Sequence, residues 1–414
     1  MNGTNEKNQL HIPILQNEQA FKHQYNVALG NENKILGIKI NGKDLVEIPK
    51  SLLSYPHLKT LDLSWNKIDT IPNDLNKFKN LEVLNLSHNK IRTSENTQLP
   101  PRIEKLGLSS NLIEEFSFKK HQTVPLRVLS LEKNRIENIP DFHQYSSMLE
   151  KINISFNFLH TVEKQFNCLP SLKILNLNNN QLKLLKSDFQ NTENLEYLNL
   201  SYNRLKNIDI RIGALKNLKI LLLKHNLIQK LPITLGNCRN LKKIELQENN
   251  LSSLPSTIVN LKALANLNAE NNNIRRLPKD IDAMSRLETF SIKGNKLRKL
   301  HSIRFLLKLE EFWCTNNDFS RESKRIIEQW KSNSHNSAYR ERILKHFGET
   351  TLSLAKKLAA GEDLEGWKKR RLIYEIDNEV MTYLFKHLPD NHPFWGQIEQ
   401  KNMLKINSEF SILR

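Results

Sequence analysis

Cysteine thiols and histidine imidazoles, the side chains most suited to chemistry, are few and scattered in this chain. His387 and His392 have a spacing that metal ligands can use, but no third ligand is apparent, so we favour a solvated loop. Cys314 takes an otherwise apolar position, where burial would raise the thiol pKa and leave it inert. Phosphate-binding glycine loops and the motifs C-x-x-C, H-E-x-x-H and G-x-S-x-G are absent from the sequence. The sequence therefore predicts no catalytic residue, no metal site and no cofactor.

A much stronger pattern is the phrase L-x-x-L-x-L-x-x-N-x-L, which recurs along most of the chain. Its step is 23 residues, shortened to 22 after Leu81 and after Leu287. The first copy begins at Ile35 and has Lys43 in place of the asparagine. A fixed period in this range indicates a solenoid. The other twelve copies contain the asparagines Asn66, Asn89, Asn111, Asn134, Asn157, Asn180, Asn203, Asn226, Asn249, Asn272, Asn295 and Asn317.

This phrase resembles the leucine-rich repeat, of the 23-residue type common in intracellular proteins. The resemblance covers roughly residues 34–319 in thirteen repeats and implies an α/β solenoid, a horseshoe with a parallel sheet on its concave face. It also implies that the twelve asparagines form a ladder between coils, from which Lys43 departs. The residues agree, because L-x-L alternation predicts a short strand with inward leucines. An asparagine amide can satisfy backbone groups that the following turn leaves unpaired. Ile-Pro and Leu-Pro pairs predict short turns, some of them helical, on the convex side.

Two segments flank the repeats. We expect residues 1–33 to form an N-terminal cap with an amphipathic helix over residues 17–28, because the end of a solenoid needs a lid. We expect residues 320–414 to be a helical C-terminal cap or small domain. In it, a helix over residues 322–331 would cover the last coil, and another would span residues 367–387. This tail resembles no family that we recognise.

Cysteine usage indicates a reducing compartment. The chain has three cysteines, and Cys168 and Cys238 fall just before the leucines that open repeats 7 and 10, where we expect them in the core. Extracellular leucine-rich-repeat proteins usually close their ends with paired cysteines, and such pairs are absent here, which predicts a cytoplasmic protein. The polar start lacks the apolar run of a signal peptide, and no segment approaches the ~20 apolar residues of a membrane span. We expect a monomer.

Side chains between the inward leucines should form rows on the concave face, ~4.8 Å apart from strand to strand. At five such positions per repeat the chain carries twelve Lys/Arg and twelve Asp/Glu, so the net charge of +18 lies elsewhere. A face with no net positive charge attracts a phosphate backbone only weakly, so we expect no nucleic acid to bind there. One row alternates strictly in sign, which favours a ladder of surface salt bridges over a docking strip. That row is Glu104, Arg127, Glu150, Lys173, Glu196 and Lys219.

A second row brings aromatic side chains onto the same face, where they have no core to join. Exposed aromatic residues are the usual anchors of protein interfaces. We therefore predict the main partner-binding region here, with packing between neighbouring strand side chains as the alternative. The predicted partner-binding residues are Phe156, Tyr197, Tyr202, Leu222 and His225, with Trp65 and Trp313 as outliers near the two ends.

A third row follows the strands of repeats 7–12 along one rim and contains no acidic residue. Its simplest interpretation is a solvated, lysine-rich rim. The alternative is a contact for an acidic partner, an anionic lipid or RNA. The basic rim consists of Lys183, Arg204, Lys206, Lys230, Arg275, Arg276, Lys296, Arg298 and Lys299.

These patterns together favour a non-catalytic scaffold or adaptor that binds a protein partner on its concave face. One alternative is an adaptor or secreted effector whose helical tail recruits a second component. Another is nucleic-acid or anionic-membrane binding through the basic rim. Bacterial effectors that join leucine-rich repeats to a ubiquitin ligase are disfavoured, because their Cys-x-Asp motif is absent and the tail is short.

Overall fold

The chain forms two compact units, residues 1–326 and 327–414. The first unit holds the repeats, and each unit is considered by itself. The computed structural model describes residues 26–29, 35–73, 75–94, 97–117, 124–139, 142, 147–163, 166, 169–185, 192–300, 309, 311–333 and 356–361.

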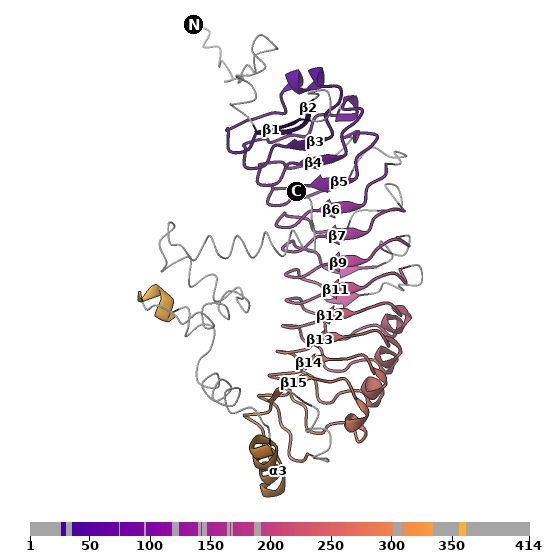
Figure 1. Cartoon of the computed structure of the whole chain (residues 1–414), viewed down its shortest axis with the longest axis vertical. Coiled ribbons are helices and arrows are strands. Elements are labelled where there is room, and N and C mark those ends of the chain that lie inside the picture. Colours follow the sequence, from indigo (N-terminus) through magenta and orange to yellow (C-terminus); the bar gives the residue numbers. More distant parts are fainter. Residues whose placement is uncertain are drawn as a thin grey trace. The chain divides into compact units, whose positions relative to one another are not determined.

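One continuous sheet runs through the first unit, with its strands stacked in chain order (Figure 1). Within the described residues, each of the thirteen repeats contributes one parallel strand, which confirms the predicted fold class. Neighbouring strands pair one repeat apart, so that Leu84 lies between Leu61 and Leu106. The strands are β2 (Ile35–Lys39), β3 (Thr60–Asp62), β4 (Val83–Asn85), β5 (Lys105–Gly107), β6 (Val128–Ser130), β7 (Lys151–Asn153), β9 (Ile174–Asn176), β11 (Tyr197–Asn199), β12 (Ile220–Leu222), β13 (Lys243–Glu245), β14 (Asn266–Asn268), β15 (Thr289–Ser291) and β16 (Glu311–Trp313).

The N-terminal edge of the sheet differs from our expectation. Residues 26–28, the end of the expected helix, belong instead to β1 (Asn26–Leu29), which pairs antiparallel with β2. The physical reason is that β2 opens the sheet and would otherwise leave a row of backbone groups unpaired. The prediction of a helix is therefore wrong for residues 26–28, and the rest of it, residues 17–25, lies outside the described residues.

Short 3-10 helices form the opposite side of the coils, as the Ile-Pro pairs predicted. Pro49, Pro232 and Pro255 stand at N-caps of these helices with extended backbone. In repeat 8 the N-cap residue is Asp209 instead of a proline, and its side chain accepts a 2.9 Å hydrogen bond from the Arg211 N–H. The helices are η2 (Lys50–Ser54), η3 (Leu75–Lys77), η5 (Ile210–Ala214), η6 (Ile233–Asn237), η7 (Ser256–Asn260) and η8 (Ile281–Ala283).

The core lies between the sheet and these turns. Inward leucines of the strands are fully buried, and core rings also meet between coils, as in Phe142 and Phe166 with centroids 5.7 Å apart. Cys238 and Cys314 are buried, as predicted, whereas Cys168 lies outside the described residues. Burial raises the pKa of Cys238 to about 11, so this thiol belongs to the packing.

The chain leaves the sheet along a rim that carries its own backbone pairing. Two short strands, β8 (Thr161–Val162) and β10 (Leu184–Leu185), pair in parallel there. Further along, backbone N–H groups continue to donate to the preceding coil, as Gln229 does to Lys206 at 3.1 Å and Arg275 to Ser252 at 3.4 Å. The rim is therefore a regular edge, with repeating positions one coil apart.

After the last strand, α3 (Arg321–Asn333) confirms the helix predicted over residues 322–331. Its buried Ser323 accepts a 3.1 Å hydrogen bond from the Leu300 N–H of the preceding coil. A helical turn lies at residues 356–359. The helix predicted over residues 367–387, both histidines of the tail and the Trp330 side chain lie outside what the structure describes. Within the described part of the chain, every helix is too short or too polar to cross a membrane.

Candidate functional site

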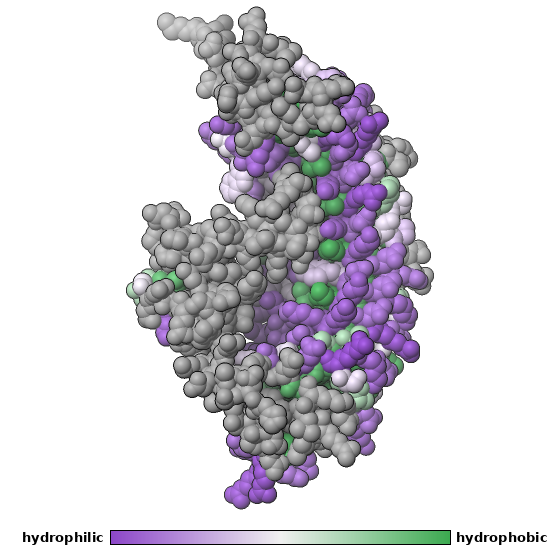
Figure 2. Space-filling model, in the orientation of Figure 1, coloured by the Kyte–Doolittle hydropathy of each residue, from purple (hydrophilic) through white to green (hydrophobic). Residues whose placement is uncertain are grey.

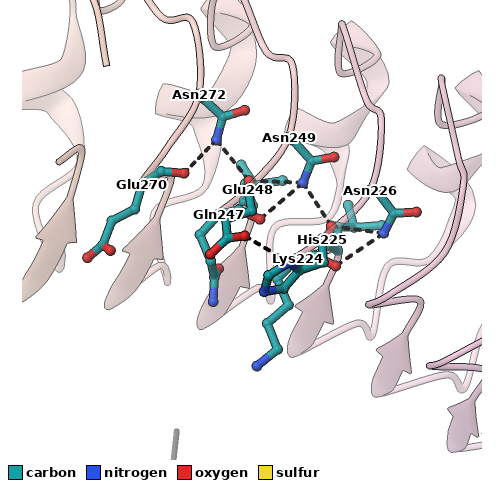
Figure 3. Close-up of polar contacts among 10 residues, drawn as sticks. Lys224, His225, Asn226, Gln247, Glu248, Asn249, Glu270 and Asn272 are labelled. Atoms are coloured by element: carbon teal, nitrogen blue, oxygen red, sulfur yellow. Dashed lines mark hydrogen bonds and ion pairs between the residues drawn. The ribbon is translucent and has the colours of Figure 1, made fainter. Parts of the chain in front are cut away.

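The twelve predicted asparagines hold adjacent coils together in one repeated arrangement. Asn249 shows it: its side-chain oxygen accepts from the Ile228 N–H at 3.0 Å, and its Nδ2 donates to the Leu223 oxygen at 2.9 Å. Nδ2 also donates within its own coil, to the Leu246 oxygen at 3.0 Å. Figure 3 shows three of these side chains on successive coils. Lys43 has no such amide, and its backbone N–H instead donates to Asn66. These asparagines therefore serve the fold and leave little for a partner to recognise.

The residue just before each ladder asparagine sits in a left-handed backbone conformation. The φ angles there lie between 51° and 59° for non-glycine residues. Glycine and asparagine adopt this conformation at low cost, whereas other L-residues lose ~1–2 kcal/mol. Our sequence reasoning missed this constraint, although Gly42, Asn179, Asn271, Gly294 and Asn316 at that position carry its signal.

Aromatic residues nevertheless occupy this strained position, and they stack from coil to coil. Trp65 lies on His88 with ring centroids 3.8 Å apart and an interplanar angle of 6°. Tyr202 lies on His225 with centroids 4.2 Å apart. Phe156, half-buried, has the Lys133 ammonium 5.6 Å from its ring centroid. The side chains of this row thus pack on one another from coil to coil, which was the alternative to partner binding in the sequence analysis.

The two stacks differ in their polar surroundings. Burial, with a smaller contribution from the charge of Lys133, lowers the pKa of His88 to about 4, so the stack under Trp65 is neutral near neutral pH. His225 instead has its Nδ1 2.9 Å from Glu248 Oε2, and this contact is the largest cause of the lowered pKa of Glu248. Figure 3 shows Glu248 next to His225, with the side chain of Lys224 projecting away from the asparagine ladder.

Apolar side chains of three neighbouring strands, β9, β11 and β12, complete a patch beside Tyr202. Tyr197 pairs with Ile174 on one side and Ile220 on the other, and Leu222 lies opposite Asn199. All four apolar or aromatic side chains are half-buried. Ile174 and Ile220 were missed by the sequence reasoning, which attended to aromatic residues, although both occupy the second position after the leucine that opens their repeat. We call Ile174, Tyr197, Tyr202, Ile220, Leu222 and His225 the concave patch.

The polar residues around the patch are largely engaged with their own chain. The Asn199 oxygen accepts from the Ser201 N–H at 3.0 Å, and Asn153 does the same for Ser155. Each such bond closes a turn at the end of a strand. The polar side chains nearby are therefore used by the backbone of the repeats, and the patch is the main apolar surface that this part of the concave face presents to a partner.

The alternating charge row forms ion pairs between coils. Glu150 accepts from Arg127 at 2.6 Å and from Lys173 at 2.9 Å, and Lys219 pairs with Glu196 at 2.7 Å. The contact with Lys173, followed by that with Arg127, holds the pKa of Glu150 below its usual range. These partly exposed pairs fit the salt-bridge interpretation.

The two tryptophans of this face lie far along the sheet from the patch. Trp65 is 59% exposed. Trp313 is half-buried, and its Nε1 donates to Glu311 at 3.3 Å.

The basic rim consists entirely of exposed side chains. Among the described residues, none of the nine takes part in an ion pair, although the concave face is rich in them. As for metals, the part of the chain that the structure describes brings no three His, Cys, Asp or Glu side chains together in a way that could hold an ion.

Comparison with known proteins agrees with this architecture. A leucine-rich-repeat family model matches residues 37–91, 56–113 and 124–182, and a second matches residues 194–215. The chain therefore carries leucine-rich repeats with a spacing of about 23 residues. Proteins with such repeats typically mediate protein–protein interactions. No curated protein sequence matches the chain.

Solved structures share the fold at low sequence identity. The internalin InlF of Listeria monocytogenes is 20% identical with a TM-score of 0.58, over 69% of this chain and 82% of that one. The leucine-rich-repeat region of FLRT2, in a complex with Latrophilin 3 and Unc5D, is 21% identical with a TM-score of 0.55, over 70% and 92%. InlJ of Listeria monocytogenes is 18% identical with a TM-score of 0.52, over 69% and 64%. At these identities the likeness concerns the fold.

Proposed function

We propose that this protein is a non-catalytic scaffold or adaptor that binds a protein partner through the concave patch. The observation that carries the proposal is the placement of large aromatic side chains where the backbone disfavours them. Tyr202 and His225, both in the patch, have φ values of 55° and 51°. Repeats 7 and 11 place asparagine at the same position, so the fold itself does not require an aromatic ring there. Backbone strain outside the core is commonly retained for function.

The patch has the composition of an interface centre. It joins two tyrosines and three aliphatic side chains on adjacent strands, and tyrosine is among the residues enriched in binding hot spots. The Tyr202–His225 stack and the Lys224 ammonium, 5.2 Å from the Tyr202 ring centroid, hold the ring in place before a partner arrives. A ring that is already ordered loses less conformational entropy on binding, which favours affinity.

Asparagine substitutions test the proposal, because they remove the ring and relieve the backbone. For Tyr202→Asn, the gain from the left-handed conformation, ~1 kcal/mol, roughly offsets the loss of stacking, ~0.5–1.5 kcal/mol. The melting temperature should therefore change little. Affinity for a protein captured by the wild-type chain should fall by ~2 kcal/mol or more. Affinity capture followed by titration calorimetry with the purified partner would measure this.

Two controls sharpen the comparison. Ile233→Asn changes an exposed side chain at the start of η6, outside the patch, and should leave the partner bound, whereas Leu222→Asn in the patch should weaken it. Trp65→Asn removes the distant stack and tells whether binding extends along the row. Unchanged affinity in both Tyr202→Asn and Leu222→Asn would show that the partner binds elsewhere.

We also propose a cytoplasmic location, which the thiol of Cys238 supports. Cys238 is free and buried, and free thiols persist in a reducing compartment. Fractionation of source cells, with antibody detection of the chain, would test this, and recovery from the extracellular medium would contradict it.

A further inference from the structure

We propose that the rim of repeats 6–12 is a second interaction surface, which docks on an anionic lipid bilayer. It consists of the basic rim together with the exposed apolar side chains that accompany it. It lies at other positions of the coil than the concave patch, so it is independent of the proposed protein-binding function.

The charge of this surface is one-sided. The nine cations span repeats 7–12, roughly 24 Å along the sheet at ~4.8 Å per strand, and the equivalent positions carry no acidic residue. All nine side chains are exposed, and the described residues provide no ion pair for them. Six of the twelve cations on the concave face, by contrast, form ion pairs with carboxylates. Such a row of unmatched cations, wider than the Debye length of ~8 Å, attracts an anionic surface.

Apolar side chains distinguish this rim from a purely electrostatic patch. Within the described residues, nine large hydrophobic side chains are exposed, and five of them follow the strands of repeats 6–9. Three of the five lie on the rim itself, and two are the first residues of η5 and η6, where the chain passes from the rim into the 3-10 helices. The exposed fractions of all five range from 43% to 65%. Figure 2 shows how hydrophilic most of the visible described surface is, with hydrophobic residues limited to separate spots. The five residues are Phe158, Leu184, Ile210, Leu227 and Ile233.

The backbone fixes these side chains relative to the cations. Leu184 lies in β10 beside Lys183, and Leu227 stands three residues before Lys230. Ile210 and Ile233 are the first residues of η5 and η6. These two helices pack closely against each other, because a Cβ added to Gly213 of η5 would come within 2.6 Å of the Thr234 oxygen of η6. The apolar side chains therefore project from a rigid edge. Ordered apolar side chains among lysines and arginines suit the boundary between headgroups and acyl chains.

This combination favours a bilayer over the other polyanions. RNA or an acidic protein would use the cations but would leave the exposed aliphatic side chains without a matching surface, because single-strand binding relies on aromatic stacking. Anionic lipid headgroups match the cations, and the acyl boundary matches the aliphatic side chains.

Vesicle flotation with the full chain tests the proposal. The probes are vesicles of phosphatidylcholine alone and of phosphatidylcholine with phosphatidylserine, at low and moderate salt. We expect binding only to the anionic vesicles. The double substitution Lys206→Glu and Lys230→Glu should lower partitioning roughly 30-fold or more, from about fivefold per basic residue. The matched control, Arg239→Glu with Arg286→Glu, makes the same charge change at exposed sites just before the strands and should lower partitioning far less.

The apolar component has its own variant. Ile210→Ser with Ile233→Ser leaves the charge unchanged and should lower partitioning several-fold, with the larger effect at moderate salt, where the electrostatic attraction is screened. Thermal melting of each variant establishes that it is folded. Equal binding to neutral vesicles, or a rim reversal no weaker in binding than its control, would overturn the proposal. So would rim-dependent binding of polyuridylic acid, or of a polyglutamate peptide, with no binding to vesicles.

Discussion

Replacement of Asn180 by alanine is the most direct test of how the coils are joined. The Asn180 side chain, buried in the middle of the ladder, accepts from the Leu159 N–H at 3.0 Å. Its Nδ2 donates to the Ile154 oxygen at 2.9 Å, and to two oxygens of its own coil at 3.1 and 3.3 Å. The alanine variant removes these four bonds without changing the apolar core.

The expected cost follows from which groups lose their only partner. The Leu177 carbonyl keeps the next ladder asparagine as a donor, and the Asn178 carbonyl keeps a backbone N–H. The Ile154 carbonyl keeps the amide of Asn157, which donates to it at 3.3 Å. Within the described residues, the Leu159 N–H has no other partner, and this residue is fully buried. A buried backbone group left unpaired costs ~1–3 kcal/mol. One such group predicts a fall of ~1–3 kcal/mol in the free energy of unfolding.

Urea denaturation followed by circular dichroism measures this change. The m-value should stay the same if the whole repeat unit still unfolds together. Asn194→Ala is the matched control, because the exposed Asn194 makes one 2.8 Å bond to the Pro170 carbonyl, and it should cost less than ~0.5 kcal/mol. A cost for Asn180→Ala no larger than that of its control would refute the idea that the ladder satisfies buried backbone groups.

Three further predictions concern packing, charge and reactivity. Gly213→Ala should destabilise by ~1–3 kcal/mol in thermal melts, because the new Cβ would meet the backbone of the next 3-10 helix at 2.6 Å; an unchanged melting temperature would contradict this close packing. Glu150 has a lowered pKa in the folded state, chiefly through Lys173, so its contribution is present above the unfolded pKa and lost as the pH falls through the folded pKa. Glu150→Gln should thus lower the free energy of unfolding by no more than ~1 kcal/mol at neutral pH, and by less in acid or high salt; a pH-independent effect would argue against the ion pair. Cys238, with its pKa raised to about 11 by burial, should react with a thiol reagent only after denaturation; rapid labelling of the native thiol would show that this part of the core opens.

Much of the fold was predictable because each structural role recurs at a fixed position. Thirteen copies of one phrase gave thirteen chances to identify the inward leucines and the ladder asparagine, and the strands lie where L-x-L alternation places them. The N-terminal edge was not predictable in this way. Residues 26–28 have no second copy, and only the open edge of β2 explains why they form a strand.

The candidate site was less predictable, because its features depend on backbone conformation and on contacts between repeats. Tyr202 could be placed on the concave face from spacing alone, but not its left-handed φ of 55° or its stacking on His225. Ile174 and Ile220 were overlooked because an isolated isoleucine in one repeat looks ordinary. Their meaning appears only when parallel pairing brings both against Tyr197.

The repeat architecture also separates the two proposed surfaces within the same coils. In repeats 8 and 9 the concave patch uses Tyr202 and Leu222, next to the strand, whereas the rim uses Lys206 and Lys230, which follow the ladder asparagine. Because β11 and β12 are hydrogen-bonded strands of one sheet, a change at the rim cannot shift the patch without breaking the ladder between coils. We therefore expect the rim double substitution, Lys206→Glu with Lys230→Glu, to leave the affinity for a concave-face partner unchanged at moderate salt. Tyr202→Asn should in turn leave binding to anionic vesicles intact. A variant that lost both activities while remaining folded would mean that one ligand spans the two surfaces.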